Sequence, residues 1–195
     1  MVIKNKNKTK NDEIIKSSRK LSSFLEQSGL HKKDFAQMVG VTLSYVYNLI
    51  DDTIPFSTRS ATLERIAVVM DVKPEEFAEY RIPQEPIIFD ETIDFLKKRQ
   101  QDLGMSTVQF LKAFPRKKRI EIVDIMRGAL PIPLDWNELK LIGNVLQIPN
   151  KELYPYWENR LKDVLSASGM NLRENQSIVD KMFACAEKQI MSQND

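Results

Sequence analysis

The sequence predicts an all-α protein with two tandem helical domains of the same kind, followed by C-terminal helices. Three observations predict this fold class. Apolar residues recur at helical spacing on both sides of Gly40. The apolar pattern of residues 63–77 returns 76 residues later, in residues 139–153. The segment 157–195 carries two further apolar stripes at helical spacing.

The composition sets the first limits on function. The chain has 195 residues, of which 42% are hydrophobic and 29% are charged, as is typical of a globular protein with one or two domains. No apolar run approaches the roughly 18 residues of a membrane span, so no membrane partner is expected. With one cysteine and one histidine, we expect no internal disulfide, no metal site and a cytoplasmic, nucleoid-associated protein.

The chain divides into five segments by charge, proline content and apolar pattern. A basic, disordered arm precedes the first helical domain, a linker with two prolines follows it, and a second domain leads into the C-terminal helices. The predicted segments are 1–11 (arm), 12–80 (first domain), 81–88 (linker), 89–156 (second domain) and 157–195 (C-terminal helices).

The region 29–52 has the pattern of two short helices joined by a tight turn. Gly40 lies between them, where the bend requires a residue that tolerates positive φ. Thr42 follows as the expected N-cap of the second helix, which is predicted from Leu43 to Asp51. The inner faces are formed by Phe35, Ala36 and Val39 in the first helix and by Val46, Leu49 and Ile50 in the second. This is a helix-turn-helix pattern.

The chain resembles the XRE family, the lambda-repressor and Cro type of helix-turn-helix regulators, over about residues 15–80. The residues that carry the resemblance are Gly29-Leu30, Phe35-Ala36, Gly40-Val41-Thr42, Val46, Leu49, Leu63, Ile66-Ala67, Met70, Val72 and Glu75-Glu76-Phe77. The resemblance implies a domain of five helices. It also implies binding to double-stranded DNA with the second motif helix in the major groove.

The resemblance places the DNA contacts on the two motif helices. The expected contact residues in this region are Lys32, Lys33, Thr42, Leu43, Ser44, Tyr47 and Asn48. Asn48 can pair with adenine and Leu43 can contact a thymine methyl group, while Lys33 can hold a phosphate or form an ordinary surface salt bridge. His31 is expected to cap the first motif helix.

Basic residues are concentrated in two clusters. Residues 1–20 hold seven basic and two acidic side chains, and residues 112–119 hold five basic side chains and no acid. The first cluster is either a solubilising tail or an arm that touches DNA. In the second cluster, the residues expected to contact phosphates are Arg116, Lys117, Lys118 and Arg119.

The second domain is predicted to be a divergent copy of the first. Leu63, Ile66 and Met70 match Leu139, Ile142 and Leu146 at an offset of 76, and the turn has been replaced by the sequence FPRKKR. The equivalent outward face would be Arg119, Ile120, Val123 and Asp124. Three hypotheses remain open: backbone contact with DNA, a surface for dimerisation or a partner, or burial of Ile120 against the C-terminal segment.

Two amphipathic helices are predicted in the C-terminal segment, the second starting near Asn171. Their apolar faces can form a lid on the second domain or join two chains in a homodimer. Cys185 is expected to be a small core residue. A homodimer would place the first domains on two half-sites about one or two DNA turns apart, at roughly 34 Å per turn.

The sequence contains no recognisable catalytic motif, and neither catalytic residues nor a cofactor are expected. The leading hypothesis is a sequence-specific DNA-binding transcriptional regulator, a repressor by analogy with the family. The alternative is a protein-interaction module that keeps the fold without reading bases, such as an antitoxin-like or polymerase-binding partner. The sequence identifies no small-molecule or protein effector.

Overall fold

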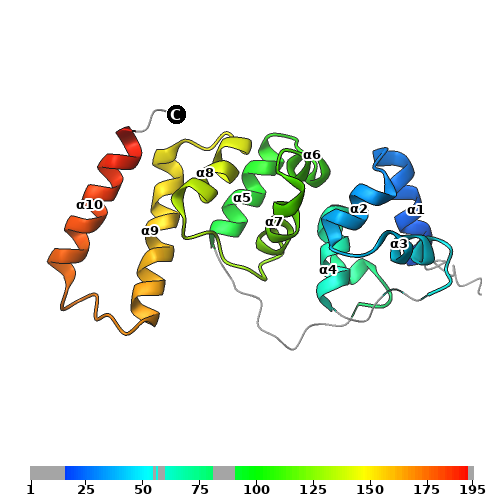
Figure 1. Ribbon diagram of the computed structural model, residues 1–195, viewed down its shortest axis with the longest axis horizontal. Coiled ribbons are helices and arrows are strands. Elements are labelled where there is room, and N and C mark those ends of the chain that lie inside the picture. Colours follow the sequence, from blue (N-terminus) through cyan, green and yellow to red (C-terminus); the bar gives the residue numbers. More distant parts are fainter. Residues whose placement is uncertain (1–15, 55, 57–59, 81–90, 193–195) are drawn as a thin grey trace, which may run out of the picture.

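The computed structural model describes residues 16–54, 56, 60–80 and 91–192. Helices form the regular structure of these residues, and no strand occurs among them. This confirms the predicted all-α class. The helices follow one another along a long axis, with the N-terminal region at one end and the last helix at the other (Figure 1). The predicted arm (1–11) and linker (81–88) lie outside the described residues.

In its described residues, the first unit contains four α-helices and one short 3-10 helix. They are α1 (Ser17–Ser28), α2 (Lys32–Val39), α3 (Leu43–Ile50), α4 (Ser60–Val69) and η1 (Pro74–Glu76). The resemblance implies five helices, but the last of them is only a single 3-10 turn. The Glu76 carboxylate accepts a hydrogen bond from the backbone N–H of Lys73 at 3.1 Å, and the turn ends at Phe77, which is buried.

The second unit follows the same order of long, short, short and long helices. Its elements are α5 (Glu91–Asp102), α6 (Thr107–Lys112), η2 (Arg116–Lys118), α7 (Arg119–Met126) and α8 (Trp136–Val145). The next helix, α9 (Asn150–Ala167), continues without a break through the boundary expected between residues 156 and 157. The last helix of the described residues is α10 (Gln176–Ser192), which lies along α9.

One continuous apolar core runs through both units. Phe35 and Phe77 are fully buried in the first unit, and Phe110, Leu111 and Ile125 are fully buried in the second. Because burial of apolar surface is the main favourable term in folding, this continuity joins the units into one body.

Most of the contact between the two units is made by α7, which packs against α2 and α4. A Cβ placed on Gly40 would lie 3.2 Å from Cδ1 of Ile120 and 3.4 Å from Nη1 of Arg65, so Ile120 lies directly against the turn after α2. Ile120 therefore contacts the first unit, so burial of Ile120 against the C-terminal segment, one of the three hypotheses for this face, is wrong. The residue that Ile120 contacts lies some 80 residues earlier in the chain, and the local apolar pattern carries no information about a contact at that separation.

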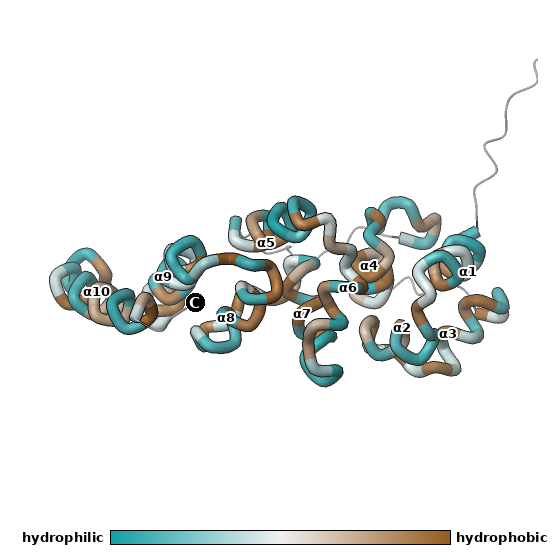
Figure 2. The backbone as a smooth tube through the Cα atoms, turned by 90° about the horizontal axis from the view of Figure 1, so that it is seen from above, coloured by the Kyte–Doolittle hydropathy of each residue, from teal (hydrophilic) through white to brown (hydrophobic). Residues whose placement is uncertain are grey.

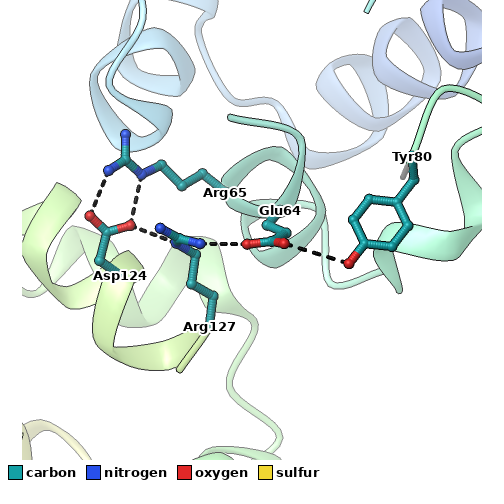
Figure 3. A network of polar contacts seen from close by, with 5 residues as sticks. All are labelled: Glu64, Arg65, Tyr80, Asp124 and Arg127. Atoms are coloured by element: carbon teal, nitrogen blue, oxygen red, sulfur yellow. Dashed lines mark hydrogen bonds and ion pairs between the residues drawn. The ribbon is translucent and has the colours of Figure 1, made fainter. Parts of the chain in front are cut away.

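Polar contacts reinforce this junction (Figure 3). Arg65 of α4 donates two hydrogen bonds to Asp124 of α7, at 2.7 and 2.6 Å. Arg127 donates to the same carboxylate at 2.8 Å and also to Glu64 of α4. The Tyr80 hydroxyl lies 3.5 Å from Glu64. Four alternating charges thus connect the two units.

The C-terminal helices form a hairpin at the end of the molecule (Figures 1 and 2). Val179, Phe183 and Ile190 are the buried residues of α10. Cys185 is exposed, so the prediction of a core cysteine is wrong. Cys185 lies on an apolar stripe of α10 next to the face that packs on α9. The sequence shows that both stripes are apolar, but it does not show which of them faces α9.

In the described part of the chain, no helix is both long enough and apolar enough to cross a membrane. The same residues contain no group of three or more potential metal-ligating side chains.

Candidate nucleic-acid interface

The turn between α2 and α3 has the geometry that its sequence predicts. Gly40 adopts the left-handed conformation with φ of 79°. The backbone N–H groups of Gly40 and Val41 both donate to the carbonyl of Ala36, at 2.9 Å each. Because a side chain is disfavoured at this φ, glycine ends α2 and allows α3 to start three residues later, at Leu43.

Thr42 is the N-cap of α3. Its hydroxyl accepts a hydrogen bond from the backbone N–H of Tyr45 at 3.2 Å, which satisfies one of the free donors at the start of the helix. At the other end, the backbone N–H and hydroxyl of Thr53 donate to the carbonyl of Asn48 at 3.0 and 3.1 Å. Both ends of α3 are therefore held by local hydrogen bonds.

The two faces of α3 differ in burial. Val46 and Leu49 are fully buried against the core. The four residues expected to face DNA are all exposed: Leu43 (39%), Ser44, Tyr47 (47%) and Asn48. An exposed apolar residue next to an exposed tyrosine and amide is a surface that can both contact a methyl group and donate and accept hydrogen bonds.

Two lysines at the start of α2 border this face. Lys32 and Lys33 are the first two residues of the helix. The Lys32 ammonium group lies 5.5 Å from the centre of the Tyr47 ring, which places a positive charge beside the exposed face of α3, and Lys33 is exposed. His31 occupies the N-cap position but makes no side-chain capping hydrogen bond, so the prediction that its side chain caps α2 is wrong.

The basic residues 116–119 differ from one another in their surroundings. Arg116 lies 3.7 Å from Asp34 in the first turn of α2 and remains largely exposed, and Lys117 is exposed. Lys118 bonds Glu138 and Glu121 at 2.7 and 3.0 Å. Arg119 donates to the carbonyl of Phe114 at 3.2 Å. Arg116 therefore lies beside the first turn of α2, while Lys118 and Arg119 hold their own unit together.

The outward face predicted for the second unit is covered by the first unit. Val123 is fully buried and Asp124 is 8% exposed. Ile120 lies against Gly40, and Asp124 receives the hydrogen bonds from Arg65 and Arg127. The residues of α7 that correspond in order to the exposed residues of α3 thus contact protein.

Sequence reasoning missed the partners of Asp124. Burial would raise the pKa of Asp124, but the hydrogen bonds from Arg65 and Arg127 outweigh it and hold that pKa below its usual value. The same bond to Asp124 raises the pKa of Arg65. The available signal was an acidic residue, Asp124, on a predicted outward helix face, together with an arginine, Arg65, on a helix of the other unit. Nothing local in the sequence linked the two residues.

Comparison with protein families matches residues 20–82 to the Cro/C1-type HTH DNA-binding domain. This match includes the α2–α3 turn and the whole exposed face of α3. No curated protein and no solved structure matches the chain. The first unit is therefore a Cro/C1-type helix-turn-helix domain.

Proposed function

We propose that this protein is a sequence-specific transcriptional regulator that binds double-stranded DNA and acts as a repressor. The observation that carries the proposal is the face of α3: a helix fixed at both ends exposes Leu43, Ser44, Tyr47 and Asn48, within a domain of the Cro/C1 type. In such domains the second motif helix lies in the major groove. The protein would act in the cytoplasm, on the nucleoid.

The proposed base readout combines one amide and one apolar contact. Asn48 would pair with N6 and N7 of adenine, and Leu43 would contact the methyl group of thymine. Ser44 and Tyr47 would bond bases or phosphates. Because this face has no arginine or lysine, we expect A·T pairs at the contacted positions rather than guanine.

Phosphate contacts would come from both units. Lys32, Lys33 and the start of α2 would contact one part of the backbone, with Thr42 at the start of α3. Arg116 and Lys117 would extend the same positive surface, since Arg116 lies beside the first turn of α2. Lys118 and Arg119 would support this surface through their bonds within the second unit.

The second unit would be a divergent copy of the first that has lost base readout. The offset of 76 residues and the shared order of helices support the duplication. Gly29 and Gly104, each at the end of the first helix of its unit, also have the same φ of 60°. In this copy, α7 would fix the first unit in place through contacts with α2 and α4.

The chain would bind its operator as a homodimer. A single domain of this kind reads a short half-site, and symmetric dimers commonly bind two such half-sites. The second unit does not offer an equivalent reading face, because α7 is covered. The second reading helix would therefore come from another copy of the chain.

The experiment selects bound DNA from random oligonucleotides and then measures the affinity of Asn48→Ala for the selected site and for random DNA. Loss of one base contact should cost about 1–3 kcal/mol on the selected site and little on random DNA. Asn144→Ala is the matched control, because Asn144 is an exposed residue of α8. Equal losses on both DNAs would contradict base readout by Asn48, and absence of salt-dependent binding would contradict DNA binding altogether.

A further inference from the structure

The last helix has a second apolar stripe that α9 does not cover. Val179, Phe183 and Ile190 are buried on the side of α9, and the Tyr154 hydroxyl of α9 donates to the carbonyl of Phe183 at 2.8 Å. These contacts fix which side of α10 faces α9. The adjacent stripe contains Ile178, Met182 and Cys185, which are exposed.

The exposed stripe has the spacing of a helix–helix contact. Ile178 is 60% exposed, Met182 is 57% exposed and Cys185 is also exposed. Their intervals of four and three residues are those of the apolar positions in a coiled coil. Since α10 lies at the end of the molecule with α9 as its main neighbour (Figures 1 and 2), a second helix can approach this stripe from outside.

Charges along one border of the stripe indicate which helix fits. Glu174, Lys181 and Lys188 follow each other at intervals of seven residues, so they lie on one side of the stripe. Glu174 precedes α10 in a helical turn, in which the backbone N–H of Asn175 donates to the carbonyl of Asn171 at 3.1 Å. The opposite border of the stripe carries Val179 and Ala186, which are apolar.

An antiparallel copy of α10 satisfies the apolar and the charged positions together. When two copies cross at residues 181–182, Glu174 of each lies opposite Lys188 of the other, and Ile178 lies opposite Cys185. Met182 then faces Met182 of the second copy. Lys181 lies opposite Lys181 of the second copy at the two-fold axis of the dimer, where the long side chains can extend into water. A parallel pairing gives Glu174 and Lys188 no opposite charge, because the facing border is apolar.

We infer that the occupant of this stripe is a second copy of the chain, docked through an antiparallel α10–α10 contact. This deepens the homodimer proposed above by naming its interface. A helix of 17 residues is about 25 Å long, so the contact belongs to the small interfaces of less than about 1,200 Å². Such a dimer dissociates on dilution, and DNA that carries two half-sites favours it by holding both copies together.

The first test is the association of the full chain, measured by sedimentation equilibrium over a wide concentration range. Met182→Lys should weaken association at least tenfold, because it places two buried charges at the centre of the contact. Ala184→Lys is the matched control: Ala184 is exposed on the same helix, away from the stripe, and association should not change. A wild-type chain that stays monomeric, or a Met182→Lys variant that still dimerises, would overturn the inference; the former would indicate a different protein as the occupant.

The second test reads the orientation by disulfide cross-linking with diamide, which takes up the two hydrogens removed from the thiols. In the antiparallel contact, the two Cys185 residues lie about 10 Å apart along the helices, too far for a disulfide. The wild-type chain should therefore not cross-link, whereas Ile178→Cys should form a covalent dimer with Cys185 of the second copy. Cross-linking of the wild-type chain would overturn the antiparallel contact.

A charge exchange provides a third readout that does not depend on apolar packing. Glu174→Lys or Lys188→Glu alone should weaken the dimer, and the double variant should restore it. Failure of the double variant to restore association would contradict the charge pairing. DNA binding is scored separately: a monomeric Met182→Lys variant should still bind a single half-site, so loss of the dimer does not count against α3 as the reading helix.

Discussion

Lys117 and Lys118 are adjacent in sequence but have different surroundings. Lys117 is exposed, close to the arginine that approaches α2. Lys118 bonds two carboxylates, and the bond to Glu138, followed by that to Glu121, raises the pKa of Lys118. The sequence predicted the same role for both residues, because neighbours in a basic run are indistinguishable without their partners. We therefore expect Lys117, rather than Lys118, to contact phosphates.

We expect Lys117→Ala to lower affinity for all DNA sequences and to reduce the salt dependence by about one unit of slope. Lys118→Ala is the matched control, since it removes the same charge one residue later. Its effect on the slope should be smaller, and its effect on thermal stability larger. Titrations at several salt concentrations measure both slopes. Equal salt dependence for the two variants would show that Lys117 does not contact the DNA phosphates more than Lys118 does.

Asp124 is the residue on which the junction between the units depends. Asp124→Ala leaves two part-buried guanidinium groups next to each other, and removal of one partner from a buried ion pair costs about 3–5 kcal/mol. We expect a loss near the lower value, because Arg65 is part exposed. Asp163→Ala, at an exposed position of α9, is the control. Denaturant unfolding measures the difference, and a loss equal to that of the control would contradict the role of the pair.

The same carboxylate predicts a pH dependence. The pKa of Asp124 is lowered in the folded protein relative to its ordinary value of 3.8, so the folded state favours the ionised form. Its contribution to stability is fully present above pH 3.8 and is lost as the pH falls through the lower, folded pKa. Asp124→Asn should therefore flatten the rise of unfolding free energy with pH in this acid range. If the pH dependence of the unfolding free energy does not change, other carboxylates determine it.

At the scale of elements, the two turns that flank α2 form a natural comparison. Gly29 and Gly40 are both left-handed, with φ of 60° and 79°. Open space surrounds the Cβ position of Gly29, whereas that of Gly40 meets Ile120 and Arg65. The first turn is thus a local feature of the chain, and the second is also part of the junction with α7.

We expect Gly29→Ala and Gly40→Ala to share the cost of a left-handed alanine, about 1–2 kcal/mol. Gly40→Ala should cost about 1 kcal/mol more, because the added methyl group crowds Ile120. Ile120→Val, which removes Cδ1, should abolish this extra cost in a double-mutant cycle. Unfolding free energies measure all four variants. Additive effects of Gly40→Ala and Ile120→Val would contradict the contact.

Local elements were predictable from the sequence because their causes are local. The pattern predicted α3 from Leu43 to Asp51, and the structure has Leu43–Ile50. The cap at Thr42 and the exposed face with Asn48 follow from the 3.6-residue period and a single hydroxyl. The cover over α7 was not predictable in this way. It depends on the contact between Arg65 and Asp124, which are 59 residues apart.

At the scale of the whole molecule, the reading helix and the proposed dimer contact lie at opposite ends. Figure 1 shows α3 near one end of the long axis and α10 at the other. Two chains joined through α10 would therefore hold their α3 helices much farther apart than the one or two turns of DNA expected from the sequence. The ion pairs between α4 and α7 keep this separation from varying freely.

Such a dimer would hold its two α3 helices at a fixed distance and a fixed relative orientation. Its affinity should therefore depend on the rotation of the double helix between the two half-sites as much as on the distance between them. An insertion of about 5 base pairs turns one half-site to the far side of the DNA, and an insertion of about 10 base pairs turns it back. We expect affinity to fall with the first insertion and to recover in part with the second, because DNA must twist or bend to restore the alignment. Operators with graded spacing measure this oscillation. A constant affinity would show that the two reading helices are not held at a fixed orientation.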